Sequence, residues 1–313
     1  MSVSTEQVTV AVPAVRRGRS IGSHQARAGQ MFVLPFLVVF VAMFALPLLY
    51  AAYISLFREQ LIGGTSFVGL HNYTRAFGDQ QLIEGTVRVA KFFCVQVPIM
   101  LALALFFALA LDSGLLRFAR IIRLGIFLPY AVPSVVAALM WGYLYGHDFG
   151  PFAQVAEKLS VSAPNFLGEH AMLWSIGNIV NWEFVGYNMI ILYAALRSIP
   201  ADLYEAAAVD GAGAIRTAWS IKIPAIRSAI ILTVIFSVIG AFQLFNEPKL
   251  LQPLAPSVID TSYTPNLYAY SLTFTSQDPN YAAAVSFLLG FVIVIASYVV
   301  LFLTNRTSRK SQS

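Results

Sequence analysis

Charged residues and cysteine are both scarce in this chain of 313 residues. Asp, Glu, Lys and Arg make up 11% of it and hydrophobic residues make up 58%, whereas soluble domains carry about 25% charged residues. A soluble core of this length cannot hide so much apolar surface, so the composition excludes a soluble enzyme and indicates that lipid surrounds the chain. The single cysteine, Cys94, excludes an internal disulfide and a cysteine-based metal site.

The residues needed for an intramembrane active site are also few. The four histidines all lie outside the apolar runs, so a zinc His-Glu-x-x-His motif or a Ser–His pair within the bilayer is not expected. A Gly-x-x-x-x-Gly-Lys-Ser/Thr phosphate loop is absent from the sequence, so any use of ATP must fall to another chain. Lys and Arg occur in short clusters between apolar runs rather than on one face, so nucleic acid is not an expected partner.

Six apolar runs are long enough, at about 20 residues each, to cross a bilayer as helices. The sequence therefore predicts an all-α membrane protein with six transmembrane helices. Pro129 and Pro133 lie inside the third run, but membrane helices tolerate proline where neighbouring helices satisfy the freed carbonyls, so one span is still expected there. The six runs cover residues 31–57, 87–111, 122–145, 172–196, 229–245 and 282–304.

The Lys and Arg residues predict the orientation. Most of them lie before the first run, between the second and third, between the fourth and fifth, and after the sixth. Basic loops stay in the cytoplasm, so both termini are predicted to be cytoplasmic.

The first run is too long for a signal peptide and no clear cleavage site follows it, so we expect a retained helix after a polar tail over residues 1–28. The membrane domain is expected over 29–313, with its core at about 82–304. The outer segment 246–281 carries five prolines and is predicted to be loop-like.

The predicted cytoplasmic loop over residues 197–228 contains a short helix and a turn. Asp202 follows Pro200 as a candidate N-cap, and Glu205 stands three residues on, as in a capping box. The Ala-rich stretch that follows is a strong helix former, and Gly211 permits a sharp turn. Because its small side chains allow another backbone to approach closely, this loop is predicted to dock a soluble partner.

The same loop resembles the EAA loop of ABC-transporter permease subunits. That pattern reads Glu-Ala-Ala, three residues, Gly, nine residues, Ile, one residue and Leu-Pro, and Ile223 departs from it where Leu is usual. The matching positions are Glu205, Ala206, Ala207, Gly211, Ile221 and Pro224. Further segments resemble the carbohydrate-uptake branch, in particular the maltose-type first permease. They are Phe127–Pro133, Trp141, Asn165–Gly168, Ile199–Pro200, Phe245–Pro248 and Tyr281–Val285.

This resemblance implies a type I ABC importer permease fold in a bacterial-type plasma membrane. It also implies a transport subunit for a di- or oligosaccharide, working with a second and distinct permease chain, cytoplasmic ATPase subunits and an extracytoplasmic solute-binding protein. The chain itself would bind no cofactor, and its partner would use ATP. The residues that the resemblance assigns to ATPase coupling are Glu205, Ala206, Ala207, Asp210 and Gly211. Without the resemblance, Glu205 reads as a solvated capping residue.

Polar side chains within the apolar runs are candidates for the substrate pathway, because amides and aromatic faces suit hydroxyl-rich ligands. At 100° per residue Trp174, Asn178, Asn181 and Asn188 share one stripe of the fourth run. The full candidate set is Asn178, Asn181, Trp182, Asn188, Gln243, Asn246 and Glu247. The alternative is that these groups form hydrogen bonds between helices. Glu183, on the opposite side, is expected to pair with Lys91 or Arg88.

Two other transporter classes fit less well. A permease for a glycerol phosphodiester or a phosphate ester would need an Arg-rich site, which the runs lack. A self-sufficient secondary transporter would leave the Glu-Ala-Ala loop unexplained.

Overall fold

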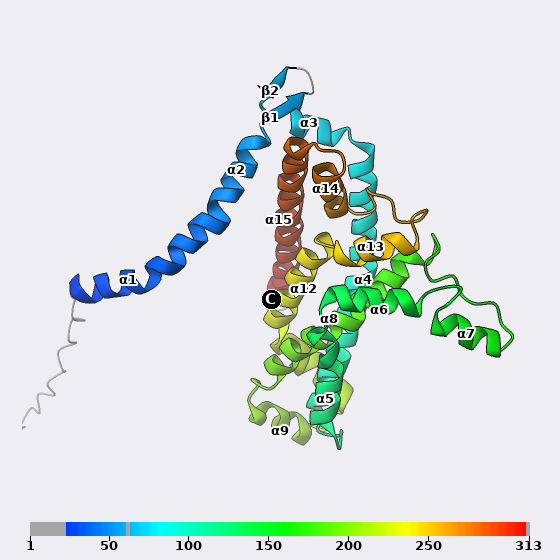
Figure 1. The fold of residues 1–313 in the computed structure, drawn as a ribbon. Helices are drawn as coiled ribbons and strands as arrows, with labels where there is room; N and C mark the ends of the chain where they lie inside the picture. The colour runs from blue at the N-terminus through cyan, green and yellow to red at the C-terminus, as the bar shows by residue number, and fades with distance from the viewer. Residues whose placement is uncertain (1–22, 61–62, 311–313) are drawn as a thin grey trace, which may run out of the picture. The chain divides into compact units, whose positions relative to one another are not determined.

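The computed structural model describes residues 23–60 and 63–310, and the chain divides into two compact units, Met1–Ala51 and Ala52–Ser313 (Figure 1). Most of the predicted tail over residues 1–28 therefore lies outside the described residues.

The described part of the first unit, from Ser23 on, is one helical segment. It consists of α1 (Ser23–Phe40), a π-helical turn η1 (Val41–Ala45) and α2 (Leu46–Ile54), whose last residues enter the second unit. Gln30–Ile54 is long and apolar enough to cross a membrane, in agreement with the first predicted run. The π-helical turn stands directly before Pro47, which cannot donate a backbone hydrogen bond, and such turns accommodate a missing bond within a helix.

Four long helices form the body of the second unit and confirm the second, fourth, fifth and sixth predicted runs. They are α4 (Gln80–Asp112), α8 (Met172–Leu196), α12 (Arg227–Phe242) and α15 (Pro279–Lys310). α4 packs along α8, and α12 packs against both α4 and α15 (Figure 1). Small residues allow the close contact between α4 and α8, because Ala104 and Ala108 are fully buried beside Met189 and Leu192.

The third predicted run is not one continuous span. It forms α5 (Ala119–Phe127), the 3-10 turn η2 (Leu128–Ala131) and α6 (Ser134–Leu144), and the two helices are bent by 96°. Proline disfavours the helical conformation of the residue before it, and Val132 is accordingly extended at φ −79° and ψ 128°. The prediction of a single continuous helix here is wrong. The described residues contain five candidate spans plus this bent pair, and the total is the predicted six if the pair is one span.

Shorter elements connect the long helices. Before α4 stand an antiparallel hairpin of β1 (Phe57–Gln60) and β2 (Gly64–Phe67), and α3 (His71–Phe77). α7 (Pro151–Lys158) precedes α8, and α9 (Ala201–Val209), α10 (Ala214–Thr217), η3 (Ala218–Lys222) and α11 (Ile223–Ala225) follow it.

The segment 246–281 is more ordered than predicted. It contains α13 (Asn246–Leu251), η4 (Gln252–Leu254) and α14 (Pro265–Phe274). Pro265 occupies the first turn of α14, where its missing N–H costs nothing, so prolines here start helices rather than prevent them.

Candidate functional site

The short helix α9 begins two residues earlier than the sequence indicates. Pro200 is its N-cap, with φ −57° and ψ 137°, and it makes no side-chain capping bond. Asp202 therefore lies in the first turn of the helix rather than at the cap, and the predicted capping box is wrong. The acidic side chain still favours the helix, because it lies near the positive end of the helix dipole.

The end of α9 is fixed by Gly211, as the sequence predicts. Gly211 has φ +71°, in the left-handed region. Its N–H donates to the carbonyl of Ala208 at 3.1 Å, and the N–H of Ala212 donates to the carbonyl of Ala207 at 2.9 Å. This pair of bonds is a Schellman motif, which ends the helix and turns the chain sharply.

The surface of α9 agrees only in part with the predicted docking face. Glu205, Ala206 and Asp210 are exposed, together with Gly211. Ala207 is 7% exposed, so its side chain faces the body of the protein. Of the two alanines predicted for the docking face, only Ala206 is exposed.

A buried ion pair joins this loop to α4. The ammonium group of Lys222 lies 2.6 Å from a carboxylate oxygen of Asp112 and 5.1 Å from the centre of the Tyr204 ring on α9. Burial raises the pKa of Tyr204, the negative charge of Asp112 raises it further, and Arg197 opposes the shift.

A cavity of about 400 Å³ lies between α4, α8, α12 and the start of α13. Its walls include four of the predicted pathway residues, Asn188, Gln243, Asn246 and Glu247.

Aromatic rings that the sequence analysis did not single out form another part of the wall of this cavity. Tyr130 and Tyr187 stack with ring centres 4.8 Å apart, and Phe184 meets Tyr130 edge to face. Tyr130 belongs to η2, so the break in the third predicted run brings this ring to the cavity.

Hydrogen bonds position the amides of this cavity. Asn246 donates to the hydroxyl of Ser134 at 2.8 Å, and Asn188 donates to the carbonyl of Phe184 at 3.0 Å. The side-chain oxygen of Asn188 is buried and has no hydrogen-bond partner among the described residues. The cavity therefore offers a polar acceptor beside an aromatic wall.

The predicted stripe along α8 is divided between two cavities. Asn178 and Asn181 line a second cavity of about 380 Å³ with Trp174, and Gln96 lines both cavities. Gln96 donates to Asn181 at 3.1 Å, and Asn178 donates to the hydroxyl of Tyr145 at 2.8 Å. These two asparagines thus make the interhelical bonds of the alternative interpretation.

Trp182 lines neither of these two cavities. Its ring packs edge to face on Trp141, with centres 5.9 Å apart. Its side chain therefore supports the contact between α8 and α6 and does not face the cavity that holds Asn188.

The expected ion pair of Glu183 is not formed. Its side chain is 3% exposed, and neither carboxylate oxygen has a hydrogen-bond partner in the described part of the chain. Arg88 instead donates to the carbonyl of Tyr263 at 2.9 Å and lies over that ring.

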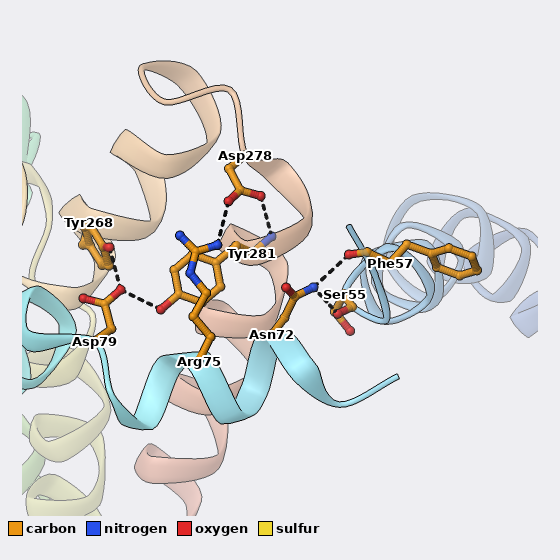
Figure 2. A network of polar contacts seen from close by, with 8 residues as sticks. All are labelled: Ser55, Phe57, Asn72, Arg75, Asp79, Tyr268, Asp278 and Tyr281. Atoms are coloured by element: carbon orange, nitrogen blue, oxygen red, sulfur yellow. Dashed lines mark hydrogen bonds and ion pairs between the residues drawn. The ribbon is translucent and has the colours of Figure 1, made fainter. Parts of the chain in front are cut away.

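A second polar network, far from α9 along α4, was not predicted from the sequence (Figure 2). Asp79 is the N-cap of α4 and accepts bonds from the N–H groups of Gln81 and Leu82. It also accepts bonds from the phenol hydroxyls of Tyr268 on α14 and Tyr281 on α15. Partial burial acts to raise the pKa of Asp79, but these four bonds outweigh it and lower the pKa below its ordinary value.

Arg75 of α3 completes this network. It lies 3.7 Å from the centre of the Tyr281 ring and forms an ion pair of 3.0 Å with Asp278 (Figure 2). Asn72 of the same helix donates to the carbonyls of Ser55 and Phe57. The network therefore ties α3, α4, α14 and α15 together.

Comparisons with known proteins agree on one family. Residues 100–310 match the family described as "Binding-protein-dependent transport system inner membrane component". The trehalose/maltose transport system permease protein MalF of Thermococcus litoralis is 30% identical over 287 residues, which cover 91% of this chain and 96% of that protein. The arabinooligosaccharides transport system permease protein AraP of Bacillus subtilis is 28% identical over 89% of this chain and 88% of that protein.

Solved structures show the same fold. A bacterial alginate ABC transporter, in complex with an alginate pentasaccharide-bound periplasmic protein, contains a chain that matches this one with a TM-score of 0.76. The match covers 93% of this chain and 98% of that chain, at 18% sequence identity.

Proposed function

Because the chain belongs to the family of binding-protein-dependent transport system inner membrane components, we propose that it forms part of the pathway for a di- or oligosaccharide in an ATP-driven importer. It is a multi-pass inner-membrane permease subunit and not an enzyme. The sugar is proposed because MalF and AraP are named for trehalose/maltose and arabinooligosaccharide transport, and because the cavity that Asn188 lines has polar and aromatic walls that suit such a ligand.

The observation that carries this proposal is the cavity lined by Tyr130, Tyr187 and Asn188. Sugars present apolar C–H faces that pack on aromatic rings, and hydroxyls that need both donors and acceptors. The stacked tyrosines supply the flat surface, while Asn188 and Gln243 supply polar groups. A volume of about 400 Å³ falls within the range of small-molecule pockets, about 300–1,000 Å³.

Coupling to ATP is proposed for α9. Glu205, Asp210 and the Gly211 turn are exposed on one short helix, and the Schellman motif holds that helix in a defined conformation. An exposed carboxylate can make a charge-assisted contact with a basic group of an ATPase chain. ATP binding on that separate chain would move α9 and so bias the permease between two conformations.

The partners follow from the same family. This chain would pair with a second permease chain, receive its sugar from an extracytoplasmic binding protein and dock cytoplasmic ATPase subunits. The loop that carries α9 would then lie on the cytoplasmic side, as would both termini.

The cavity is tested with Tyr187→Ala in the assembled complex. We expect the sugar concentration for half-maximal ATP hydrolysis to rise about fivefold, since stacking on an aromatic ring contributes about 1 kcal/mol. Trehalose, maltose and lactose are the probes. Tyr298→Ala is the matched control, because that tyrosine is exposed on α15 and does not line the cavity. An unchanged response in Tyr187→Ala would contradict the assignment of this cavity.

A further inference from the structure

Lys222 makes contact with two elements that lie about one hundred residues apart in the sequence. Its ammonium group forms the 2.6 Å pair with Asp112, the last residue of α4, and lies 5.1 Å from the Tyr204 ring in the middle of α9. The side chain of Asp112 is 5% exposed and that of Lys222 is 14% exposed. The pair is therefore largely shielded from water and from screening by salt.

The position of Asp112 is unfavourable for the helix alone. A negative charge at the carboxyl end of a helix opposes the helix dipole, and burying it without a partner destabilises the fold. Lys222 removes both penalties. It reaches Asp112 from η3, a π-helical turn, and such turns are frequent at functional sites. An isolated charge pair of this kind stabilises a fold little, but it fixes the relative position of the two elements that carry it.

Tyr204 gives this pair its connection to α9. The face of an aromatic ring attracts a cation within about 6 Å of its centre, and the Lys222 ammonium lies inside this limit. The hydroxyl of Tyr204 is buried without a hydrogen-bond partner in the described residues, so the ring is held by packing and by the cation. A displacement of α9 would therefore act directly on Lys222.

α4 carries the connection onward to the cavity. The half of α4 that ends at Asp112 packs on α8 through Ala104 and Ala108. One to two turns nearer the start of α4, Gln96 and Met100 line the cavity of about 400 Å³. Close-packed helices move together rather than deform independently. Movement of the Asp112 end of α4 would thus reach the wall of the cavity.

We propose that Lys222 is a positioning residue that links α9 to the Asp112 end of α4, so that the two move as one body when an ATPase acts on α9. This inference rests on the proposed function, since it needs an ATPase that docks at α9. It identifies the route by which the docking event reaches the cavity, and it assigns a role to Asp112 and Tyr204 as well.

The test measures the distance between α9 and α4 in the complete complex in lipid nanodiscs. Spin labels are placed at Ala201→Cys, the first residue of α9, and at Ser113→Cys, directly after α4, in a Cys94→Ala background. Both label sites are exposed. Distances are recorded without nucleotide and after trapping with ATP and vanadate. We expect the same narrow distance distribution in both states, because the link keeps the two ends together.

The double variant Asp112→Asn/Lys222→Met removes both charges, so the fold keeps no buried unpaired charge and the complex is expected to assemble. In this variant we expect the distance to shift on trapping, by about 1–5 Å, the scale of helix displacements in switching transitions. Lys222→Arg keeps the charge and should restore the unshifted distance. Asp278→Asn breaks the more exposed Arg75–Asp278 pair at the other end of the unit and serves as the matched control, with no shift expected.

If Lys222 only stabilised the fold, its loss would change the label distance equally with and without nucleotide. A change of distance that appears only on trapping therefore distinguishes coupling from stability. The inference is overturned if the double variant hydrolyses ATP and shows the same distance in both states, or if the distance shifts on trapping in the unaltered protein. If no ATPase co-purifies with the unaltered chain, the proposed function fails and this inference fails with it.

Discussion

The phenol hydroxyl of Tyr281 donates a hydrogen bond of 2.6 Å to the same carboxylate oxygen of Asp79 that Tyr268 contacts at 2.7 Å, although Asp79 and Tyr281 are 202 residues apart. Three helices meet at this oxygen. Since Asp79 also caps α4, one carboxylate fixes both the start of that helix and its contact with α14 and α15 (Figure 2).

Replacing Asp79 by Ala should destabilise the protein. The change removes an N-cap, which contributes about 1 kcal/mol, and two hydrogen bonds from phenols, which contribute about 0.5–1.5 kcal/mol each at this partly exposed carboxylate. We expect the free energy of unfolding to fall by about 2–4 kcal/mol when measured by denaturant in detergent. Glu84→Ala is the control, because this exposed carboxylate accepts a hydrogen bond from Gln80 alone among the described residues and should change stability by less than about 0.5 kcal/mol. Equal effects of the two changes would contradict the role of Asp79.

The stabilising effect of Asp79 should depend on pH. Its pKa is lowered below the ordinary value of 3.8, so the folded state favours the ionised form. The stability that this provides is present above pH 3.8 and is lost as the pH falls through the lower pKa of the folded state. Burial and the bond to Asp79 raise the pKa of Tyr268 above 10.0, so its contribution is present below pH 10 and declines above it.

The difference in free energy of unfolding between the unaltered protein and Asp79→Asn should therefore stay constant from about pH 5 to 9 and decrease at both extremes. Denaturant titrations at a series of pH values measure this difference. A difference that grows as the pH falls below 4 would show that Asp79 is not the ionised acceptor of this network.

Gly211→Ala should weaken the end of α9 by backbone strain alone. An added Cβ meets nothing within 4 Å, but the φ of +71° is costly for a residue with a side chain. We expect a loss of about 1 kcal/mol in stability and a reduced yield of ATPase on co-purification. Gly213→Ala is the matched control, because Gly213 has φ −71° and also has open space around it. If both variants recover the ATPase to the same extent, the turn at Gly211 is not needed for docking.

Gly186→Ala should disrupt the contact between α8 and the bend after α5. A Cβ at this position would collide with the backbone carbonyl oxygen of Ile126, which cannot rotate away as a side chain can. Overpacking of this kind costs about 1–3 kcal/mol or more, so we expect a lower thermal midpoint and loss of the complex. At Gly177 on the same helix the nearest atom, in the Phe92 ring, would be 3.6 Å away, and Gly177→Ala should be tolerated. A stable Gly186→Ala protein would show that the two segments do not approach this closely.

Much of the fold follows from the sequence because the signals are local. Apolar runs predict the four long helices of the second unit, and α8 coincides with the predicted 172–196. The bend in the third run was missed, although Pro133 carries a signal for it, because tolerance of proline in membrane helices was given more weight than its effect on Val132. The helices within 246–281 were missed for a related reason, since prolines there start helices rather than interrupt them.

The site was predicted less completely because it depends on which helices meet. A spacing of 100° per residue identifies the face of α8 on which Asn178, Asn181 and Asn188 lie. It does not show that two cavities lie along this face, with Gln96 of α4 in the wall of both. It also gives no partner for Glu183, which the packing leaves buried without one among the described residues. The aromatic wall depends on Tyr130, which reaches the cavity through the bend that the sequence did not reveal.

The function proposed for this chain is ATP-driven sugar transport through a complex that contains it. The most direct measurement is uptake of radiolabelled trehalose, maltose, lactose or diacetylchitobiose into proteoliposomes that contain the co-purified complex and its binding protein, with ATP supplied on the side of α9. We predict accumulation of at least one of these sugars that requires ATP and is lost when the ATPase is left out. Uptake that proceeds equally well without ATP and without the ATPase would contradict the account and favour a secondary transporter.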